Sequence, residues 1–248
     1  MNLKVIGSSS AGNAYILEND QEALLIECGV NFDKIKQALN FNLSKVSGCL
    51  LTHEHGDHGK SINEVMRAGI DVWASAGTHL ALRSDGSHRA RVTHSGHQFN
   101  VGNFKVKSFD IKHDVAEPLG FIINHPETGN VLFITDSYYC EYNFNAVGLH
   151  NIIIEANYCQ TIVDRRMSEG SIIKGLRDRV IESHMSLATC KKMLGANDIS
   201  KVNNIVLIHL SDGNSDEKRF KKEVEEQTGK RVHIATPGMQ IEFNNKPF

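Results

Sequence analysis

Cysteine is scarce in this sequence and shows no metal-binding spacing. The sequence lacks a CxxC motif, and its five cysteines are scattered: Cys28, Cys49, Cys140, Cys159 and Cys190. An odd, scattered set indicates neither a disulfide framework nor a zinc knuckle, so we expect reduced thiols in or near the core.

Long apolar runs are also absent. The longest, such as residues 152–154, are far too short to cross a bilayer. The first residues, MNLKVIGSSS, lack the apolar region of a signal peptide. We therefore expect a cytoplasmic protein that has no membrane partner.

An excess of positive charge is missing as well. The formal net charge is −2, which excludes a global basic signature for nucleic acid. Hydrophobic content of 40% and charged content of 23% are ordinary for a soluble globular protein. Positive charge gathers only locally, in residues 83–97 and 165–179. A solvated helix face and a phosphate-binding surface explain these two clusters equally well.

Strand-like and helix-like stretches alternate along the chain. Apolar or alternating segments predict strands at residues 3–6, 14–17, 23–27, 48–51, 72–74, 104–109, 121–124, 131–135, 151–155, 205–209, 232–235 and 240–243. Helical patterns cover residues 32–39, 61–68, 79–82, 186–194 and 215–227, and Ser186 is a plausible N-cap. This order predicts layered sheets flanked by helices. Without a linker or short-period repeat, residues 1–248 are expected to form a single domain.

The segment at residues 52–58, THEHGDH, is the most informative feature that is present. It holds three imidazoles and two carboxylates directly after the apolar residues 46–51. These ligand types suit zinc, manganese or iron, and the lack of cysteine argues against a closed structural zinc site. Adjacent Asp57 and His58 cannot easily turn to the same ion as His53 and His55. The spacing therefore suggests two metals, and two metals suggest hydrolysis.

Further candidate ligands follow other predicted strands. His113, Asp136 and His209 each come at or just after the end of a strand, where the loops of a rigid sheet usually assemble a site. The remaining histidines outside these motifs are expected to make ordinary hydrogen bonds: His79, His88, His94, His97, His125, His150 and His233.

The pattern His53-x-His55-x-Asp57-His58 resembles the signature of the metallo-β-lactamase fold. Six further segments occur in the order found in the YycJ/WalJ branch of that superfamily: GSSSAGNA (7–14), HDVAEPLGF (113–121), TDS (135–137), IEAN (154–157), SHMS (183–186) and HLSDGN (209–214). The resemblance covers nearly the whole chain. It implies an α/β fold, a four-layer αββα sandwich of two mixed β-sheets flanked by helices.

The resemblance also implies roles for individual residues. A first metal would be held by His53, His55 and His113, and a second by Asp57, His58 and His209. Asp136 would bridge both metals, which are expected to be two divalent ions per chain, Zn²⁺ or Mn²⁺ or else Fe²⁺. Asp57 and His184 are the candidate catalytic residues. His184 is expected to contact the phosphate or shuttle a proton, with a supporting role as the alternative.

Several positions depart from the family pattern. Glu27 stands where aspartate is usual, and it can support a metal ligand only if the backbone adjusts. Tyr158 replaces a histidine, while Ser183 and Ser9 replace glycines. Glu54 fits poorly as a ligand and is expected to accept a hydrogen bond from a ligating imidazole or to face solvent.

The resemblance implies a dinuclear metal-dependent phosphodiesterase that uses a metal-bridging hydroxide, and specifically an exonuclease acting on single-stranded DNA in the 5′-to-3′ direction. The alternatives are an RNA nuclease, a cyclic-nucleotide phosphodiesterase, or a thioester or lactone hydrolase. A non-catalytic nucleic-acid-binding relative is disfavoured by the intact ligand set.

The intervals between motifs limit the accessory parts. Only 72 residues separate Asp136 from His209, too few for a β-CASP insertion, and no arm like that of RNase Z is visible. Residues 138–185 are rich in arginine and aromatic side chains, which together can grip single-stranded nucleic acid. Most of these aromatic residues are expected to belong to the core: Tyr138, Tyr139, Tyr142, Phe144 and Tyr158.

Overall fold

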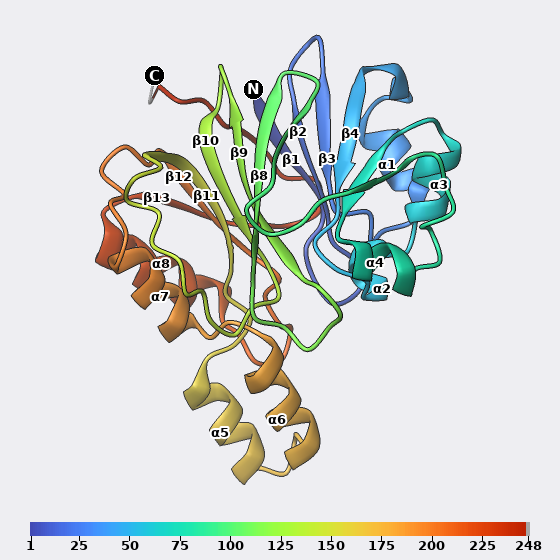
Figure 1. The fold of residues 1–248 in the computed structure, drawn as a ribbon. Helices are drawn as coiled ribbons and strands as arrows, with labels where there is room; N and C mark the ends of the chain where they lie inside the picture. The colour runs from blue at the N-terminus through green and yellow to red at the C-terminus, as the bar shows by residue number, and fades with distance from the viewer. Residues whose placement is uncertain (247–248) are drawn as a thin grey trace.

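Two seven-stranded sheets pack face to face in the computed structural model, which describes residues 1–246 (Figure 1). The first sheet has the order β14 (Gln240–Glu242), β1 (Asn2–Gly7), β2 (Ala14–Glu18), β3 (Ala23–Ile26), β4 (Val46–Leu50), β5 (Val72–Ala74) and β6 (Ala90–Val92). The second has the order β13 (Arg231–Ile234), β12 (Asn204–Ile208), β11 (Leu149–Glu155), β10 (Gly129–Ile134), β9 (Leu119–His125), β8 (Phe104–Asp110) and β7 (Gln98–Val101). Both sheets are mixed, with parallel pairs such as β3–β4 and β10–β11 beside antiparallel ones.

The layer between the sheets is apolar. Tyr15 on β2 and Phe133 on β10 meet edge to face with ring centroids 5.6 Å apart, and both are fully buried. Fully burying an aliphatic or phenylalanine side chain contributes about 1.5–3 kcal/mol relative to leaving it exposed. Strands β10 to β12 are apolar on both faces because helices cover their outer side, as their unbroken apolar runs predict.

Helices form the two outer layers. Against the first sheet lie α1 (Phe32–Ala38), α3 (Ile62–Arg67) and α4 (Ala76–Ala81), with the short α2 (Gly56–Gly59) at its edge. Against the second lie α7 (Leu187–Gly195) and α8 (Glu217–Thr228). The Ser186 hydroxyl accepts a hydrogen bond from the Thr189 N–H and caps α7, as predicted. The predicted αββα sandwich of two mixed sheets is confirmed.

A polar clamp around Glu22 joins the two sheets. Glu22, in the turn between β2 and β3, accepts hydrogen bonds from Asn103 N (3.1 Å), Asn103 Nδ2 (2.8 Å) and His125 Nε2 (3.1 Å) of the second sheet. Ser47 Oγ donates a further bond to it at 3.2 Å. Ser47 belongs to β4 of the first sheet, so this carboxylate ties the two sheets together through the three hydrogen bonds from Asn103 and His125.

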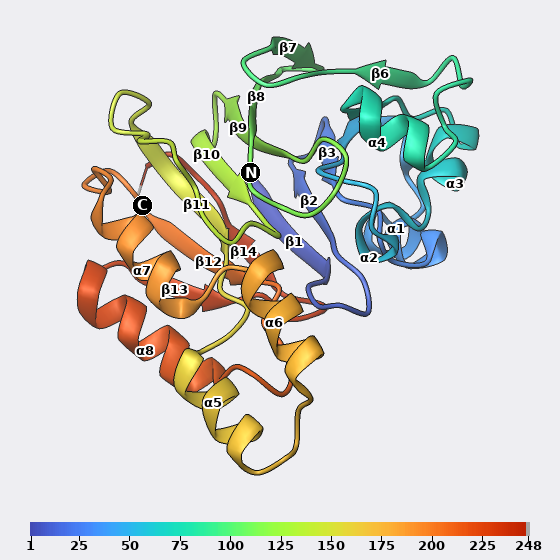
Figure 2. The same cartoon turned by 60° about the horizontal axis from the view of Figure 1, so that its bottom comes forward.

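Helices α5 (Gln160–Ser168) and α6 (Lys174–Ser183) form a hairpin that projects from the edge where β11 ends (Figure 2). The sequence patterns did not predict it, nor the short strands β6 and β7. Val163 is the one buried residue within α5, and α6 buries only Ser183 within its bounds. Helices that bury so little carry almost no apolar periodicity.

No helix in residues 1–246 is long and apolar enough to cross a membrane. The assignment of residues 1–248 to a single domain without a β-CASP insertion stays a prediction.

Candidate metal centre

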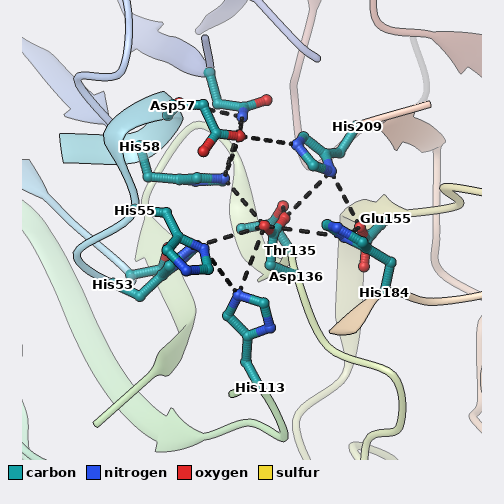
Figure 3. A network of polar contacts seen from close by, with 12 residues as sticks. His53, His55, Asp57, His58, His113, Thr135, Asp136, Glu155, His184 and His209 are labelled. Atoms are coloured by element: carbon teal, nitrogen blue, oxygen red, sulfur yellow. Dashed lines mark hydrogen bonds and ion pairs between the residues drawn. The ribbon is translucent and has the colours of Figure 1, made fainter. Parts of the chain in front are cut away.

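The strand directions bring the candidate residues to one edge. Strands β8, β10, β11 and β12 of the second sheet all run the same way, because β9 is antiparallel to both β8 and β10. Their carboxyl ends deliver His113, Asp136, Glu155 and His209 to that edge, where the loop after β4 brings residues 53–58 (Figure 3).

A first group contains three imidazoles around one point. His55 Nδ1 lies 3.2 Å from His53 Nε2 and 3.2 Å from His113 Nε2. Asp136 Oδ2 lies 3.7 Å from His53 Nε2 and 3.9 Å from His113 Nε2. Two neutral ring nitrogens can share only one proton, so this convergence leaves lone pairs that a cation would satisfy. Tetrahedral zinc bound at about 2.0–2.1 Å separates imidazole nitrogens by about 3.3–3.4 Å, so the group fits a divalent ion.

A second group lies on the other side of Asp136. Asp57 Oδ2 lies 3.2 Å from His209 Nε2 and 3.4 Å from His58 Nε2. Asp136 Oδ2 lies 3.2 Å from the same nitrogen of His58. All seven residues predicted as ligands thus belong to two of the three potential ligand groups that share Asp136, the third being Asp136 with Glu155, His184 and His209. The bridging role of Asp136 stays a prediction.

The charges of the site are interdependent. Burial opposes ionisation of Asp136, but the charges of His209 and His58 outweigh it and hold the pKa of Asp136 well below its usual range. Burial also opposes protonation of His209, yet Asp136 and the hydrogen bonds to Asp57 and Glu155 raise its pKa to about 10. Burial, followed by the charge of His58, lowers the pKa of His53. Anionic carboxylates enclosed among imidazoles favour a bound cation.

Asp136 and His209 have left-handed backbone conformations. Their φ angles are +46° and +55°, and Glu27 at the end of β3 has +64°. Non-glycine residues rarely adopt this region. At these three positions the left-handed conformation turns the chain sharply at the end of the strand. The side chain is thereby directed toward the edge where the ligand groups lie.

Glu155, the last residue of β11, is a buried carboxylate with four donors around it. Its Oε1 lies 2.7 Å from His184 Nδ1 and 3.1 Å from His209 Nδ1. Its Oε2 accepts hydrogen bonds from the backbone N–H groups of Ser137 (3.1 Å) and Met185 (2.9 Å). Sequence reasoning placed Glu155 in a motif but gave it no role. Because Glu155 accepts a hydrogen bond from His184, Nδ1 of this imidazole carries a proton, and Nε2 remains available on the side of the cavity.

Asn13 was also missed as a supporting residue. Its Nδ2 lies 3.3 Å from Asp57 Oδ2 and 3.2 Å from the Asp57 carbonyl oxygen, and its backbone N–H donates to the same carbonyl at 2.7 Å. A Cβ at Gly29 would overlap that carbonyl. The sequence did hold a signal for this role, because Asn13 is the next-to-last residue of GSSSAGNA (7–14), one of the segments that carry the family resemblance.

Glu27 makes only a loose contact with the site. Its Oε2 lies 3.5 Å from His58 Nδ1, at the outer limit of a hydrogen bond, although the backbone has taken the left-handed conformation. Burial raises the pKa of this carboxyl. The longer side chain thus reaches the histidine that the usual aspartate would support, but without a short hydrogen bond.

The two roles expected for Glu54 were wrong. Its Oε1 accepts a hydrogen bond from the Ala116 backbone N–H at 2.9 Å, and the side chain is half-buried. It therefore holds the loop that follows His113 rather than a ligating imidazole. None of the seven remaining histidines joins these groups within residues 1–246; His79 instead contacts Ser84 and His125 contacts Glu22.

A cavity of about 520 Å³ opens in front of these residues. His55, Asp57, His113 and His184 line its inner side, and the α5–α6 hairpin closes the opposite side with Arg166 and Arg179. Of the two basic clusters in the sequence, only residues 165–179 reach this cavity. In the other, Arg89 and Arg91 pair with Asp71 at 2.9 and 2.7 Å.

The prediction that most aromatic residues of 138–185 belong to the core was wrong. Phe144 and Tyr158 are buried, but Tyr138, Tyr139 and Tyr142 are 46%, 53% and 40% exposed. Tyr138 and Tyr139 lie on the surface in the loop that follows Asp136, but neither lines this cavity, and Tyr139 lines a separate one together with Tyr142.

Residues 23–210 match the beta-lactamase superfamily domain, which is more than half of the chain. The chain belongs to this superfamily. Its two sheets and flanking helices are those of the metallo-β-lactamase fold, and the metallo-β-lactamase fold protein YhfI from Bacillus subtilis superposes with a TM-score of 0.75. That match covers 97% of this chain and 98% of YhfI at 16% identity, which supports the fold alone.

Two relatives of this chain carry exonuclease names. Exodeoxyribonuclease YycJ of Bacillus anthracis is 29% identical over 169 residues, which cover 64% of this chain and 63% of YycJ. The match therefore spans somewhat less than two thirds of YycJ. Exodeoxyribonuclease WalJ of Streptococcus pneumoniae serotype 2 is 25% identical over 225 residues, covering 85% of this chain and 82% of WalJ.

The predicted resemblance to the metallo-β-lactamase fold and the YycJ/WalJ exonucleases is confirmed. The chain is a metal-dependent hydrolase, and its fold together with the histidine–aspartate groups implies binding of divalent metal.

Proposed function

We propose that this hydrolase is a dinuclear phosphodiesterase that degrades single-stranded DNA from its 5′ end. The observation that carries the proposal is Asp136, which belongs both to the group with His53, His55 and His113 and to the group with Asp57, His58 and His209, and which lines the cavity. His53, His55 and His113 would hold one divalent ion, and Asp57, His58 and His209 the other. The ligand types suit Zn²⁺, Mn²⁺ or Fe²⁺.

Two bound divalent ions would activate a water molecule and offset the negative charge that develops on the phosphate. Asp57 Oδ2 faces His58 and His209, which leaves Oδ1 as the acceptor for a proton of the attacking water. Asn13 holds this carboxylate in place through its amide.

His184 is the proposed general acid. Burial opposes its protonation, but the charge of Glu155 and the hydrogen bond to it raise the pKa of His184, which favours the imidazolium at neutral pH. With Nδ1 bound to Glu155, the proton on Nε2 is free to pass to the leaving oxygen of the substrate.

Three features support nucleic acid as the substrate. Arg166 and Arg179 face the site across the cavity, where they would offset phosphate charge. Outside the cavity, the exposed rings of Tyr138 and Tyr139 in the loop after Asp136 offer flat surfaces on which further bases of a single strand would stack. The names of YycJ and WalJ point to DNA. The 5′-to-3′ direction rests on the family resemblance alone.

The test is digestion of 5′- or 3′-labelled single- and double-stranded oligonucleotides with Mn²⁺ or Zn²⁺. Stepwise release of nucleotides from the 5′ end of single-stranded DNA is expected. Asp136→Ala should abolish it, and the exposed Asp85→Asn should retain it.

Other results would overturn parts of the proposal. Cleavage of RNA or duplex in preference would overturn the substrate, and hydrolysis of a thioester, lactone or cyclic nucleotide without oligonucleotide cleavage would overturn the reaction. Metal analysis of replete protein should find about two ions per chain. A count of one or none would contradict the dinuclear centre.

A further inference from the structure

The α5–α6 hairpin presents one face of α6 to the cavity. Leu176, Arg179, Val180 and Ser183 line it, and their spacing of three and four residues places them on one side of the helix. His184 follows directly at the end of α6. Arg179 is therefore roughly 6 Å along the helix axis from the end that carries His184, which is of the order of one nucleotide step.

Arg166 on α5 is anchored beside this face. Its Nη1 donates to Asn214 Oδ1 at 2.7 Å, and its Nη2 donates to the Ser171 carbonyl oxygen at 3.3 Å. The guanidinium lies so close to Gly213 that a Cβ there would overlap it. Neither partner is a carboxylate, so the positive charge of Arg166 stays uncompensated at the cavity wall.

Arg179 differs from Arg165 and Arg177, two other arginines of the hairpin, because those two pair with carboxylates. Arg165 pairs with Glu169 at 3.8 Å, and Arg177 pairs with Asp178 at 2.9 Å and Asp164 at 3.9 Å. Within residues 1–246, no carboxylate pairs with Arg179, and its side chain is exposed at the cavity. A planar guanidinium with all its donors available is suited to bind a phosphate through two hydrogen bonds.

We propose that Arg179, with the charge of Arg166 beside it, binds a second phosphate of the substrate, adjacent to the phosphodiester that is cleaved. The inference rests on the proposed phosphodiesterase function and narrows its substrate class. The preferred substrate would be a chain that carries consecutive phosphates, whereas a lone diester would occupy only the metal end of the cavity.

The second phosphate has two sources, a 5′-terminal phosphate or the next internal diester. Steady-state kinetics with four substrates distinguish them: bis(p-nitrophenyl) phosphate, a dinucleoside monophosphate, the same dinucleotide with a 5′-phosphate, and a trinucleoside diphosphate with a 5′-hydroxyl. The variant is Arg179→Gln. The matched control is Arg165→Gln, in the same hairpin but paired with Glu169 and away from the cavity.

Arg179→Gln should raise KM about 10- to 100-fold for substrates with a second phosphate, with little change in kcat. It should leave the lone diesters unaffected, and it should reduce the slope of log KM against log salt by about 0.7. An effect limited to the 5′-phosphorylated dinucleotide would assign the terminal phosphate, and an effect on the trinucleoside diphosphate would assign the internal one. Equal behaviour of the two variants on every substrate would overturn the inference.

A binding measurement distinguishes failure of this inference from failure of the proposed function. The same ligands can be titrated into His184→Ala protein, with and without Arg179→Gln. Loss of the preference for two phosphates in the double variant would support the inference even if no phosphodiester is turned over. An unchanged preference would refute it even if wild-type protein is an active exonuclease.

Discussion

Glu155 Oε1 lies 2.7 Å from His184 Nδ1, and the same oxygen lies 3.1 Å from His209 Nδ1. One buried carboxylate oxygen therefore orients both the proposed general acid and a proposed metal ligand. Its second oxygen is occupied by two backbone N–H groups, so the carboxylate cannot easily turn away. Proton donation and metal binding are thus expected to depend on the same side chain.

Replacement of Glu155 by Gln should weaken both functions. The amide carries no charge and can present an N–H where Glu155 accepts one, so His209 and His184 lose their fixed orientation. We expect metal affinity and activity to fall about 10- to 100-fold. Chelator competition and oligonucleotide digestion measure these losses. The exposed Glu182→Gln on α6 is the control, and equal metal affinity in both variants would contradict the role of Glu155.

Replacement of His184 by Ala should reveal the proton donor through the leaving group. A DNA alkoxide needs a proton as it leaves, whereas p-nitrophenolate does not. We expect kcat on oligonucleotides to fall about 10²- to 10⁴-fold and kcat on bis(p-nitrophenyl) phosphate to change little. Metal content should stay the same. If both substrates slow equally, His184 acts by positioning rather than by donating a proton.

Removal of metal should destabilise the fold. The ligand groups join the loop after β4 to the ends of β8, β10 and β12, so a bound ion links the two sheets. Binding to the native state alone stabilises by about 2.7 kcal/mol when metal is present at 100 times its Kd. We expect the Tm to rise with added Zn²⁺ or Mn²⁺ and to fall with chelator. The Asp136→Ala variant should show a much smaller response to metal in the same thermal scan.

Glu22 should make the free energy of unfolding depend on pH in the acid range. Burial opposes its ionisation, but the hydrogen bonds from Asn103, His125 and Ser47 outweigh burial and lower the pKa of Glu22. A carboxyl with a lowered pKa in the folded state contributes stability that is complete above its unfolded pKa, about 4.3. That stability is lost as pH falls through the lower folded value.

Glu22→Gln should therefore cost about 1–3 kcal/mol at neutral pH, because its amide sets a donor against the Asn103 N–H groups. The variant should also lose less stability than wild type between neutral pH and acid. Urea unfolding at several pH values measures both effects, with the exposed Glu226→Gln as the control. Parallel pH curves for wild type and Glu22→Gln would exclude the clamp.

Short-range spacing made much of the site predictable from the sequence. His53, His55, Asp57 and His58 stand within one short loop, and Asp136 and His209 each follow an apolar strand. Strand periodicity therefore located these residues without knowledge of the fold. The contact between Glu155 and His184 could not be predicted from the sequence. It requires the end of α6 to lie beside the end of β11, and no local sequence pattern encodes that arrangement.

Solvent exposure was the other limit of sequence reasoning. Tyr138 and Tyr139 look like core residues by type, but the loop after Asp136 turns them outward. The α5–α6 hairpin was missed for a related reason, since a helix pair that projects from the body needs few apolar residues. Both features concern the surface of the molecule, where residue type alone says little about exposure.

The left-handed backbone of Asp136 suggests that the protein is not built for maximal stability at its centre. A non-glycine residue in this region costs about 1–3 kcal/mol. Asp136→Ala and Asp136→Gly both remove the carboxylate that compensates the charges of His58 and His209, but only glycine relaxes the turn. In the presence of chelator, we expect the glycine variant to resist urea better than the alanine variant. If both unfold at the same urea concentration, the turn is unstrained; otherwise, the need for a carboxylate at this position has kept the backbone in a conformation that costs stability.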